Sequence, residues 1–513
     1  MIEFGSPDGR GEDAPVIVIG AGPAGLTAAY ELSRAGLRAI VLEKDHVVGG
    51  LARTVSYKKY RFDIGGHRFF TKVAPVDQMW REVLGNDFVR RPRKSRILYR
   101  GRYLDYPLNA TNVLKGLGPA AALRAILSYA VARGRPRRPE RSMEDWVINR
   151  FGAFLYRTFF KTYTEKVWGL PCAEIAAEWA AQRIRGLSLR QAVVAAFFPS
   201  RRRGIKTLMD AFDYPRLGPG QMWEAVRDRL AAAGRPVLLG LEVVAVRHDG
   251  RRVLRVEASG TLGRQGCAAW HVISSMPLRE LVERLDPPAP AEVLEAARAL
   301  RYRDFITVAL IIDRPHVFPD NWIYVHDPNV RVGRIQNFGN WSPDLVPDTG
   351  RSCLGFEYFC FEGDGLWKMS DEALLALARG EAERLGLVPA TAIIDGTVAR
   401  MAQAYPVYDG QYAAKLEIIR SFLRRLPNLH PVGRNGLHKY NNQDHSMFTA
   451  MLAVRNILGE HHDVWSVNAD CEYLEEIRDD FRAKLPLSGH VPTPPVPVPG
   501  RGGRASASIP LAG

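Results

Sequence analysis

Near the start of the chain, two continuous apolar runs are separated by a stretch in which apolar residues recur at helical spacing. An apolar run at 16–19 leads into a glycine-rich turn at 20–25, a stretch with helical spacing follows, and a second apolar run covers 37–42. This order predicts a strand–helix–strand unit over 14–42 with two buried parallel strands. From 76 to 204, apolar residues recur three and four positions apart with few strand signals, which predicts a helical region.

Beyond residue 205 the pattern changes mainly to strands. Alternating valines around Asp249-Gly250 predict a hairpin, and a run rich in β-branched and aromatic residues predicts an antiparallel sheet. The predicted elements are a hairpin over 238–258, a buried strand over 272–277, the sheet over 305–361, and helices over 372–385 and 447–458. The proline-, glycine- and serine-rich residues after 485 predict a disordered tail.

The turn at 20–25 reads Gly-Ala-Gly-Pro-Ala-Gly. Gly20 permits the tight turn, Gly22 lets a phosphate approach the backbone, and Gly25 lets helix and strand pack closely. The following helix presents unpaired N–H groups and the positive end of its dipole to an anion. Glu43 ends the second strand 18 positions after Gly25, which suits an acceptor for ribose hydroxyls. The sequence therefore predicts a dinucleotide site at this turn.

Two features favour FAD over NAD as the dinucleotide. The glycine turn lies at the extreme start of the chain, and a second pair, Gly49-Gly50, follows the second strand. Adjacent glycines let a backbone approach a flat ligand, so this pair and Gly65-Gly66 are predicted to line the cofactor. The predicted cofactor contacts are Gly20, Gly22, Pro23, Ala24, Gly25, Glu43, Lys44, Gly49, Gly50, Leu51, Gly66, His67 and Arg434.

The strands of the predicted nucleotide-binding sheet are separated by other material. We therefore expect an α/β fold, with a discontinuous Rossmann-like FAD-binding domain, a helical insert and an antiparallel β-sheet substrate domain. The FAD-binding domain is predicted to cover 14–75, 205–278 and 425–475, the helical insert 76–204 and the substrate domain 279–424, with the disordered tail at 486–513.

Composition changes this picture mainly through charge. Hydrophobic residues make up 46% and charged residues 24%, which is ordinary for a globular protein, but the formal net charge is +15. Arginines cluster at 90–96, 133–141 and 201–203. Such charge suits an anionic small substrate, an anionic membrane surface or nucleic acid. Since no nucleic-acid module is visible, we expect an anionic substrate and no nucleic acid, with weak membrane-surface association left open.

Cysteine spacing bears on disulfides and metal sites, and hydropathy bears on the cellular location. The five cysteines are scattered and form no CxxC, which predicts buried thiols rather than disulfides or a metal site. No apolar run is long enough to cross a bilayer, and the first fourteen residues are polar and glycine-rich, so we expect a cytoplasmic protein. The oligomeric state is not predicted.

Ordered segments along almost the whole chain carry a family resemblance. They are Asp63–His67, Tyr163–Trp168, Tyr214-Pro215 with Gly218 and Gly220, Trp322–Tyr324, Arg334 with Asn340–Pro343, Ala404–Pro406, and Gly433-Arg434 through Tyr440 to Ser446. In these segments, over about 16–468, the chain resembles the FAD-dependent UDP-galactopyranose mutases, more the eukaryotic type than the short bacterial one. It resembles the protoporphyrinogen oxidases and amine oxidases more distantly.

The resemblance implies roles for particular residues. Arg334 and Arg183 match arginines that hold the substrate diphosphate or its sugar near the flavin, and Arg434 matches the junction of flavin and substrate. His67 matches a histidine beside the isoalloxazine. The residues implied at the substrate are Tyr324, Tyr405, Tyr440, Trp168 and Arg434. The alternatives left open are ordinary ion pairs for the arginines and core packing for the aromatic residues.

The resemblance also implies a reaction, a pyranose–furanose interconversion of a UDP-galactose-like sugar through an adduct with N5 of reduced FAD. Two other functions stay open: an FAD-dependent oxidase or desaturase, and a flavin-binding scaffold without turnover. A mutase predicts arginines and tyrosines that converge near the flavin, whereas an oxidase predicts an apolar tunnel there. The sequence has no dedicated nicotinamide-binding repeat, so NAD(P)H as an external reductant would bind transiently over the flavin.

Overall fold

The computed structural model describes residues 14–106, 118–177, 180 and 211–467. Its first sheet is parallel and has five strands in the order β20-β13-β1-β2-β9. These strands are β1 (Val16–Ile19), β2 (Ala39–Leu42), β9 (Val237–Leu238), β13 (Val272–Ser274) and β20 (Leu429–Pro431). Helix α1 (Pro23–Arg34) joins β1 to β2, which confirms the predicted strand–helix–strand unit.

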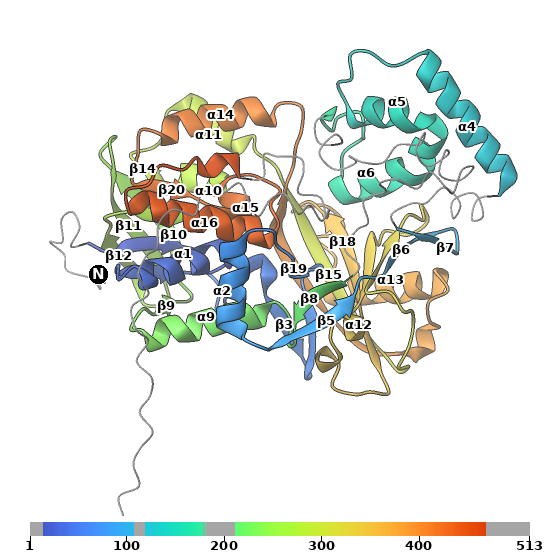
Figure 1. The fold of residues 1–513 in the computed structure, drawn as a ribbon, viewed down its shortest axis with the longest axis horizontal. Coiled ribbons are helices and arrows are strands. Elements are labelled where there is room, and N and C mark those ends of the chain that lie inside the picture. Colours follow the sequence, from blue (N-terminus) through green and yellow to red (C-terminus); the bar gives the residue numbers. More distant parts are fainter. Residues whose placement is uncertain (1–13, 107–117, 178–179, 181–210, 468–513) are drawn as a thin grey trace, which may run out of the picture. The chain divides into compact units, whose positions relative to one another are not determined.

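Each face of this sheet contributes to a different core. Val16 and Val18 of β1 pack with helices α1, α2 (Ala74–Leu84), α9 (Gly220–Ala232) and α16 (Gln443–Ile457). Figure 1 labels α1 and α16, two of the helices that pack on this sheet. Ile17 and Ile19 pack on the other side, against a second sheet and the helices that flank it. Side chains of a strand alternate between faces, so burial on both sides explains the continuous apolar runs of β1 and β2.

The second sheet has four strands in the order β12-β11-β10-β14. They are β10 (Glu242–His248), β11 (Val253–Gly260), β12 (Gly263–Ala268) and β14 (Leu285–Asp286), flanked by α10 (Leu278–Glu283), α11 (Ala291–Arg298) and α14 (Tyr412–Leu423). Strands β10 and β11 form the predicted hairpin around Asp249-Gly250.

The third sheet has seven strands in the order β19-β15-β18-β17-β16-β6-β7. They are β6 (Ser95–Tyr99), β7 (Arg102–Asp105), β15 (Tyr302–Ile312), β16 (Trp322–Val325), β17 (Arg334–Asn337), β18 (Ser352–Cys360) and β19 (Ile393–Pro406). Neighbours are antiparallel except β6 and β16, which are parallel. The predicted antiparallel sheet over 305–361 is thus confirmed, and α13 (Asp371–Arg384) packs on it where a helix is predicted.

The prediction of few strands between 76 and 204 is wrong. Strands β6 and β7 extend the third sheet, and β5 (Phe88–Pro92) pairs with β8 (Ala211–Pro215). The charged arginines of this stretch interrupt the apolar alternation that would indicate a strand. Their charge is neutralised by residues distant in sequence: Arg96 forms a forked ion pair with Asp320, whose side chain is fully buried. Pairing between distant segments therefore overrides the local signal.

The remainder of this region is helical, as predicted. Its elements are α4 (Pro119–Gly134), α5 (Met143–Leu155), a π-helical stretch over Tyr156–Lys161 and α6 (Thr162–Trp168). Ser142 and Asp145 form a capping box at the start of α5. Gly152 has φ of +82°, and a Cβ there would lie 2.7 Å from the backbone nitrogen of Tyr129, so α4 and α5 approach closely at a glycine.

The start of α16, the cysteines and the length of the helices can also be compared with the predictions. Helix α16 begins at Gln443, four residues before the predicted start, because Asn442 already has the extended backbone of an N-cap. Cys172, Cys267, Cys353 and Cys360 are buried thiols, as predicted. None of the described helices is long and apolar enough to cross a bilayer. The tail at 486–513 lies outside the described residues, and the predicted domain boundaries stay a prediction.

Candidate active site

The glycine turn between β1 and α1 is shaped by backbone contacts. Gly20 has φ of +95°, and a Cβ on Gly25 would lie only 1.8 Å from the carbonyl oxygen of Gly20. Gly22 is the N-cap of α1, and in the described part of the chain no side chain caps its first turn. Pro23 takes the first helical position, where its missing N–H costs nothing. The start of α1 therefore offers backbone donors to an anion.

The second glycine pair lies directly against this turn. Gly49 and Gly50 both have positive φ, and Gly49 N donates to Ala21 O at 2.8 Å. A Cβ on Gly50 would lie 3.1 Å from the Cα of Gly22. Only glycines permit this approach, so the two turns together form one surface of half-buried backbone that no side chain of these glycines covers. We call this surface, residues 20–25 with 49–50, the glycine cradle.

Glu43 braces the cradle from the end of β2. Its buried carboxylate accepts from Ala21 N at 2.6 Å and from Asp45 N at 2.9 Å. Lys44, beside it, is exposed. The structure thus places Glu43 at the turn where a ribose acceptor is expected, and it adds a bond to the turn that the sequence does not reveal. Its ribose role stays a prediction.

A second group of predicted residues converges from distant segments. We call His67, Arg334, Tyr405, Arg434 and Tyr440 the arginine–tyrosine cluster. The rings of Tyr405 and Tyr440 stack with centroids 5.5 Å apart, and the guanidinium carbon of Arg434 lies 5.3 and 5.4 Å from those centroids. A Cβ on Gly65 would lie 3.6 Å from the His67 ring and 3.7 Å from Nη2 of Arg334.

Arg334 is held by a buried carboxylate that the sequence analysis misses. It lies on β17 opposite Glu357 of β18, and the two side chains form an ion pair in which Glu357 is fully buried. Gln336 donates to the other oxygen of Glu357 at 2.6 Å. Burial alone would lower the pKa of Arg334, but the carboxylate outweighs it and holds that pKa well above its usual value. Glu357 is the only acidic residue of the apolar stretch 352–360, a signal that could have identified it.

Two ionisable residues of the cluster, His67 and Tyr405, keep their neutral forms. Burial, with Arg434 and Arg334 adding to it, lowers the pKa of His67 to about 3. Its Nδ1 is buried and has no hydrogen-bond partner in the described part of the chain. Burial and the neighbouring Tyr440 raise the pKa of Tyr405 to about 12, against the pull of both arginines. His67 is therefore an uncharged ring, and Tyr405 retains a hydroxyl proton to donate.

Helix α6 and strand β16 supply aromatic side chains beside the cluster. Trp168, at the end of α6, is buried with its ring 5.8 Å from that of Tyr440. Tyr324 lies on β16 opposite Arg334 and contacts Tyr163, whose ring stacks on His326 at 4.6 Å. The stacking partner His326 is not among the predicted residues. Arg183, predicted with Arg334, lies outside the described residues.

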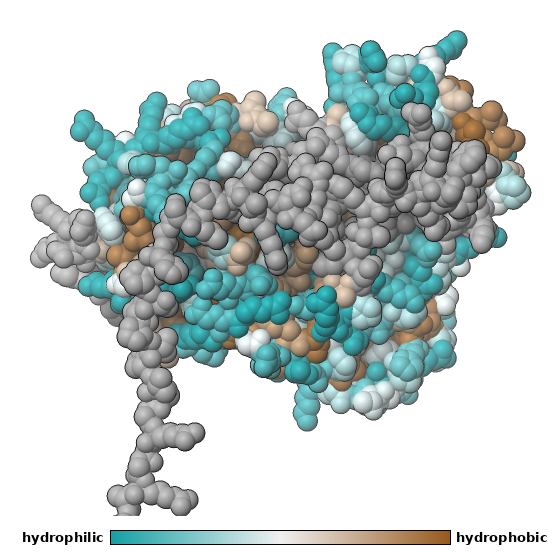
Figure 2. Space-filling model, in the orientation of Figure 1, coloured by the Kyte–Doolittle hydropathy of each residue, from teal (hydrophilic) through white to brown (hydrophobic). Residues whose placement is uncertain are grey.

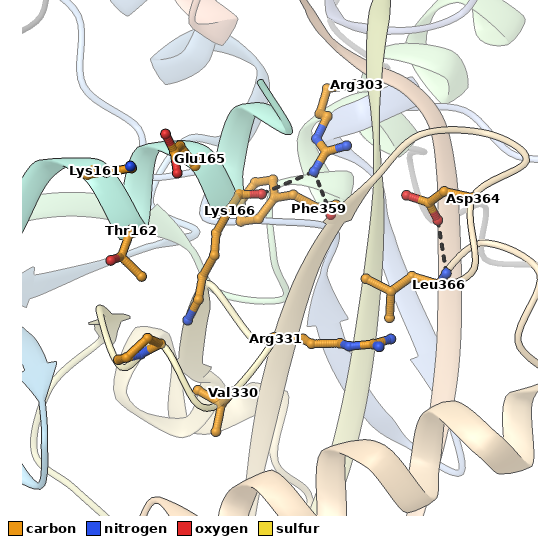
Figure 3. Close-up of a pocket in the computed structure, with 11 residues that line it drawn as sticks. Lys161, Thr162, Glu165, Lys166, Arg303, Val330, Arg331, Phe359, Asp364 and Leu366 are labelled. Atoms are coloured by element: carbon orange, nitrogen blue, oxygen red, sulfur yellow. Dashed lines mark hydrogen bonds between the residues drawn. The ribbon is translucent and has the colours of Figure 1, made fainter. Parts of the chain in front are cut away.

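A different set of α6 side chains lines a cavity of about 480 Å³ (Figure 3). Lys166 extends beside this cavity, and its Nζ donates to the carbonyl oxygens of Val325, Asp327 and Val332 at 3.3, 2.6 and 3.3 Å. Arg303 donates to the carbonyls of Val167 and Lys166 at the end of α6 and to Phe359 O.

These two cations, the buried Arg303 and the half-buried Lys166, fasten α6 to the third sheet. Burial lowers the pKa of Lys166 to about 8, although the carboxylates of Glu381 and Asp327 oppose the shift. Lys166 ties α6 to the turn between β16 and β17, which carry Tyr324 and Arg334. We therefore interpret Lys166 as a support for the cluster rather than a member of it.

The cradle and the cluster meet at the closing segment α15 (Gly433–Gly436). Gly433 has φ of +77°, and a Cβ there would lie 2.9 Å from the Cβ of Ala24 in the first turn of α1. Arg434 therefore begins next to the cradle and ends at the tyrosine pair. Leu51, just after the cradle, packs against the same small core as Tyr405, a core that contains Phe305. A long cofactor anchored at the cradle can reach the cluster along this path.

Comparisons with known proteins agree with this architecture. The family model described as "Flavin containing amine oxidoreductase" matches residues 23–427. A structure titled reduced UDP-galactopyranose mutase aligns with a TM-score of 0.77 and 21% identity, covering 89% of this chain and 97% of that one. A putative protoporphyrinogen oxidase from Exiguobacterium sp. 255-15 aligns at 0.65 and 17%, covering 87% and 99%. The expected α/β fold class, with an amine-oxidase-type FAD domain and an antiparallel sheet domain, is confirmed.

Other proteins align with a lower TM-score or over a shorter part of the chain. Wild-type putrescine oxidase bound to putrescine aligns with a TM-score of 0.57 and 18% identity, covering 87% of this chain and 99% of that one. Among curated proteins, an inactive all-trans-retinol 13,14-reductase of Danio rerio is 48% identical over 54 residues, 10% of this chain and 9% of that protein. Thiamine thiazole synthase of Aeropyrum pernix is 57% identical over 35 residues, 7% of this chain and 13% of that protein.

Proposed function

We propose, from the premise that the chain belongs to the flavin-containing amine oxidoreductase family, that it is a mutase. In this proposal it interconverts the pyranose and furanose forms of a nucleotide-diphosphate sugar, of which UDP-galactose is the model. The family implies FAD as the cofactor; the use of its reduced form belongs to the proposal. The single observation that carries the proposal is the presence of two arginines beside two stacked tyrosines, of which Tyr405 is neutral, at the end of the path from the cradle.

The residues of the cradle fit FAD. The pyrophosphate would bind the uncapped N–H groups at the start of α1, Glu43 would accept from the ribose, and the flavin end would lie toward His67 and Arg434. The buried Nδ1 of His67 is an unpaired polar atom that a flavin could satisfy. When bound and reduced, FAD would supply a nucleophile for the anomeric carbon of the sugar.

The charge of the cluster favours an anion. Arg334 and Arg434 bring two positive charges, and Glu357 cancels one of them, so a net positive charge faces the neutral His67 and Tyr405. A diphosphate gains negative charge as the bond to the sugar breaks. Arginine stabilises that charge well, because its forked donors match phosphate oxygens and stay protonated. We assign the leaving diphosphate to Arg334, with Tyr324, Tyr405 and Tyr440 as hydroxyl donors.

The same features weigh against a cationic amine substrate. Two guanidinium groups repel an ammonium ion, and the ring centroids of Tyr405 and Tyr440 are 5.5 Å apart, which is direct stacking contact with no room for a substrate between them. The second candidate function is an oxidoreductase acting on an apolar substrate. It is favoured by the aromatic side chains next to the cluster, Trp168, Phe305 and Phe359.

One assay separates these functions. The purified yellow protein is incubated with UDP-galactofuranose, with and without dithionite, and the sugar nucleotides are separated by chromatography. The proposal expects conversion to UDP-galactopyranose only in the reduced sample, and NADPH in place of dithionite tests the physiological reductant. Peroxide production without any sugar nucleotide would establish the oxidase instead. Binding of flavin with neither activity would leave the scaffold function.

A further inference from the structure

Helix α4 presents an apolar stripe to solvent. Leu123, Ile126, Leu127 and Val131 are 59%, 44%, 57% and 67% exposed. Their spacing of three and four residues puts them on one side of the helix. Figure 2 shows this stripe as a hydrophobic (brown) patch at the upper right, where Figure 1 draws α4. Exposed apolar groups gathered in this way mark an interaction surface.

The opposite side of α4 is fixed to the protein, which sets the direction of the stripe. Ala132 is buried against α5, and Ser128 Oγ accepts from Phe154 N at 2.9 Å. Gly152 contacts the α4 backbone where any side chain would collide. The stripe therefore cannot turn inward without breaking the contact between α4 and α5.

Arginines lie beside the stripe, mainly at the C-terminal end of α4. Arg124 lies within α4, and Arg133, Arg135, Arg138 and Arg141 follow at its C-terminal end, all of them exposed. In the described part of the chain none of these five forms an ion pair, whereas the intervening Arg137 pairs with Glu144 and Asp145. The surface thus combines an apolar centre with an arginine-rich end, in which the carboxylate of Glu140 lies near Arg138 but forms its ion pair with Arg150.

We propose that α4 docks this protein on an anionic lipid bilayer, with the stripe inserted at the level of the headgroups and the arginines on the lipid phosphates. Apolar side chains next to basic ones are the composition of helices that lie in the membrane interface. With 16 residues, α4 is about 24 Å long and suits such an orientation. This proposal is independent of the reaction at the cluster.

Charge argues against a second copy of the chain as the occupant. A two-fold dimer brings the same patch of both copies together. Parallel α4 helices would then place two arginine groups side by side. Antiparallel helices would place each group near the positive end of the other helix dipole. Lipid phosphates meet the same arginines with opposite charge, so the bilayer is the better match.

The test is cosedimentation of the full-length yellow protein with vesicles of phosphatidylcholine and phosphatidylglycerol in equal parts. We expect binding to these vesicles, weaker binding to pure phosphatidylcholine, and a loss of at least about tenfold in partitioning for Leu123→Ser/Leu127→Ser/Val131→Ser. The matched control is Val47→Ser/Leu254→Ser/Leu262→Ser, which removes three exposed apolar residues elsewhere and should bind like wild type. Equal binding by the stripe variant would overturn the proposal.

A charge series tests the arginine-rich end separately. Arg133→Gln/Arg135→Gln/Arg138→Gln should lose binding, while Arg251→Gln/Arg314→Gln/Arg425→Gln, with the same net charge, should retain it. If the two variants bind alike, only the overall charge matters and the site assignment is wrong. Light scattering without vesicles measures the oligomeric state and so tests a second copy of the chain as the occupant. A wild-type dimer that the stripe variant converts to monomer would show that a second copy, not lipid, covers α4.

Discussion

The glycine cradle and the arginine–tyrosine cluster are built in opposite ways. The cradle is backbone, made by residues within 31 consecutive positions (20–50), and its shape depends on missing side chains. The cluster consists of side chains from residues 67 to 440, which lie on four separate segments of the chain. The dinucleotide site proposed at the cradle therefore depends on backbone shape rather than on particular side chains. The cluster decides what happens beside it, so function must be argued there.

The largest effect is expected from filling the cradle. In Gly25→Ala the new methyl group would overlap the carbonyl of Gly20, so the turn must open and FAD binding should be lost. The measurement is the flavin absorbance per protein after purification and reconstitution with FAD. Gly380→Ala is the control, because its site in α13 is open and helical, and it should stay yellow. A yellow Gly25→Ala protein would contradict the cradle assignment.

The next effect concerns the ion pair of the cluster. Arg334→Met should reduce turnover by about 100-fold, because a donor to the leaving diphosphate is lost, while flavin stays bound. It should also lower the free energy of unfolding by about 3 kcal/mol, because Glu357 becomes a buried unpaired charge.

A double variant separates these two consequences. Adding Glu357→Gln should restore the free energy of unfolding, measured by urea denaturation, without restoring turnover. If Arg334→Met/Glu357→Gln regains wild-type turnover, the diphosphate assignment of Arg334 is wrong.

Support of the cluster by Lys166 gives a pH signature. The pKa of Lys166 is about 8 in the folded protein against an ordinary 10.5, so between these values the unfolded chain holds more protons. The free energy of unfolding of the wild type should therefore rise with pH across this window, by up to about 3 kcal/mol relative to Lys166→Met. Lys161→Met, at an exposed lysine of the same cavity, should keep the wild-type slope. Parallel slopes in all three proteins would show that the pKa of Lys166 is not lowered in the folded protein.

The smallest effect is expected at His67. Its pKa of about 3 means that it is already neutral at physiological pH and supplies no proton. His67→Asn should shift the flavin spectrum but cost far less than the roughly 100-fold typical of a lost acid–base group. Because the unfolded chain binds the proton near pH 6.5, wild-type stability should fall as pH drops from about 6.5 toward 3, and the variant should lack that part of the slope. A rate profile that loses an inflection near neutral pH in the variant would contradict a neutral His67.

The difference between the two regions also explains what the sequence can predict. The strand–helix–strand unit, the hairpin at Asp249-Gly250 and helix α13 depend on local patterns, and all three are found. Strands β5 and β6 are missed because they pair with β8 and β16, far along the chain. Strand β7 is missed with them, because it pairs only with β6.

In the site, the cradle is predicted from glycine spacing alone, whereas the cluster residues come from the family resemblance. Neither residue spacing nor the family resemblance predicts the roles of Glu357 and Lys166. Their roles depend on which strand and turn face them, and no local spacing encodes that.

The most direct test of the central claim is a crystal structure of the reduced protein with FAD and UDP. The account predicts FAD pyrophosphate on the glycine cradle and the UDP diphosphate hydrogen-bonded to Arg334, with tyrosine hydroxyls of the cluster as further donors. A complex in which UDP binds elsewhere, or in which Arg334 remains bonded only to Glu357 at saturating UDP, would contradict it.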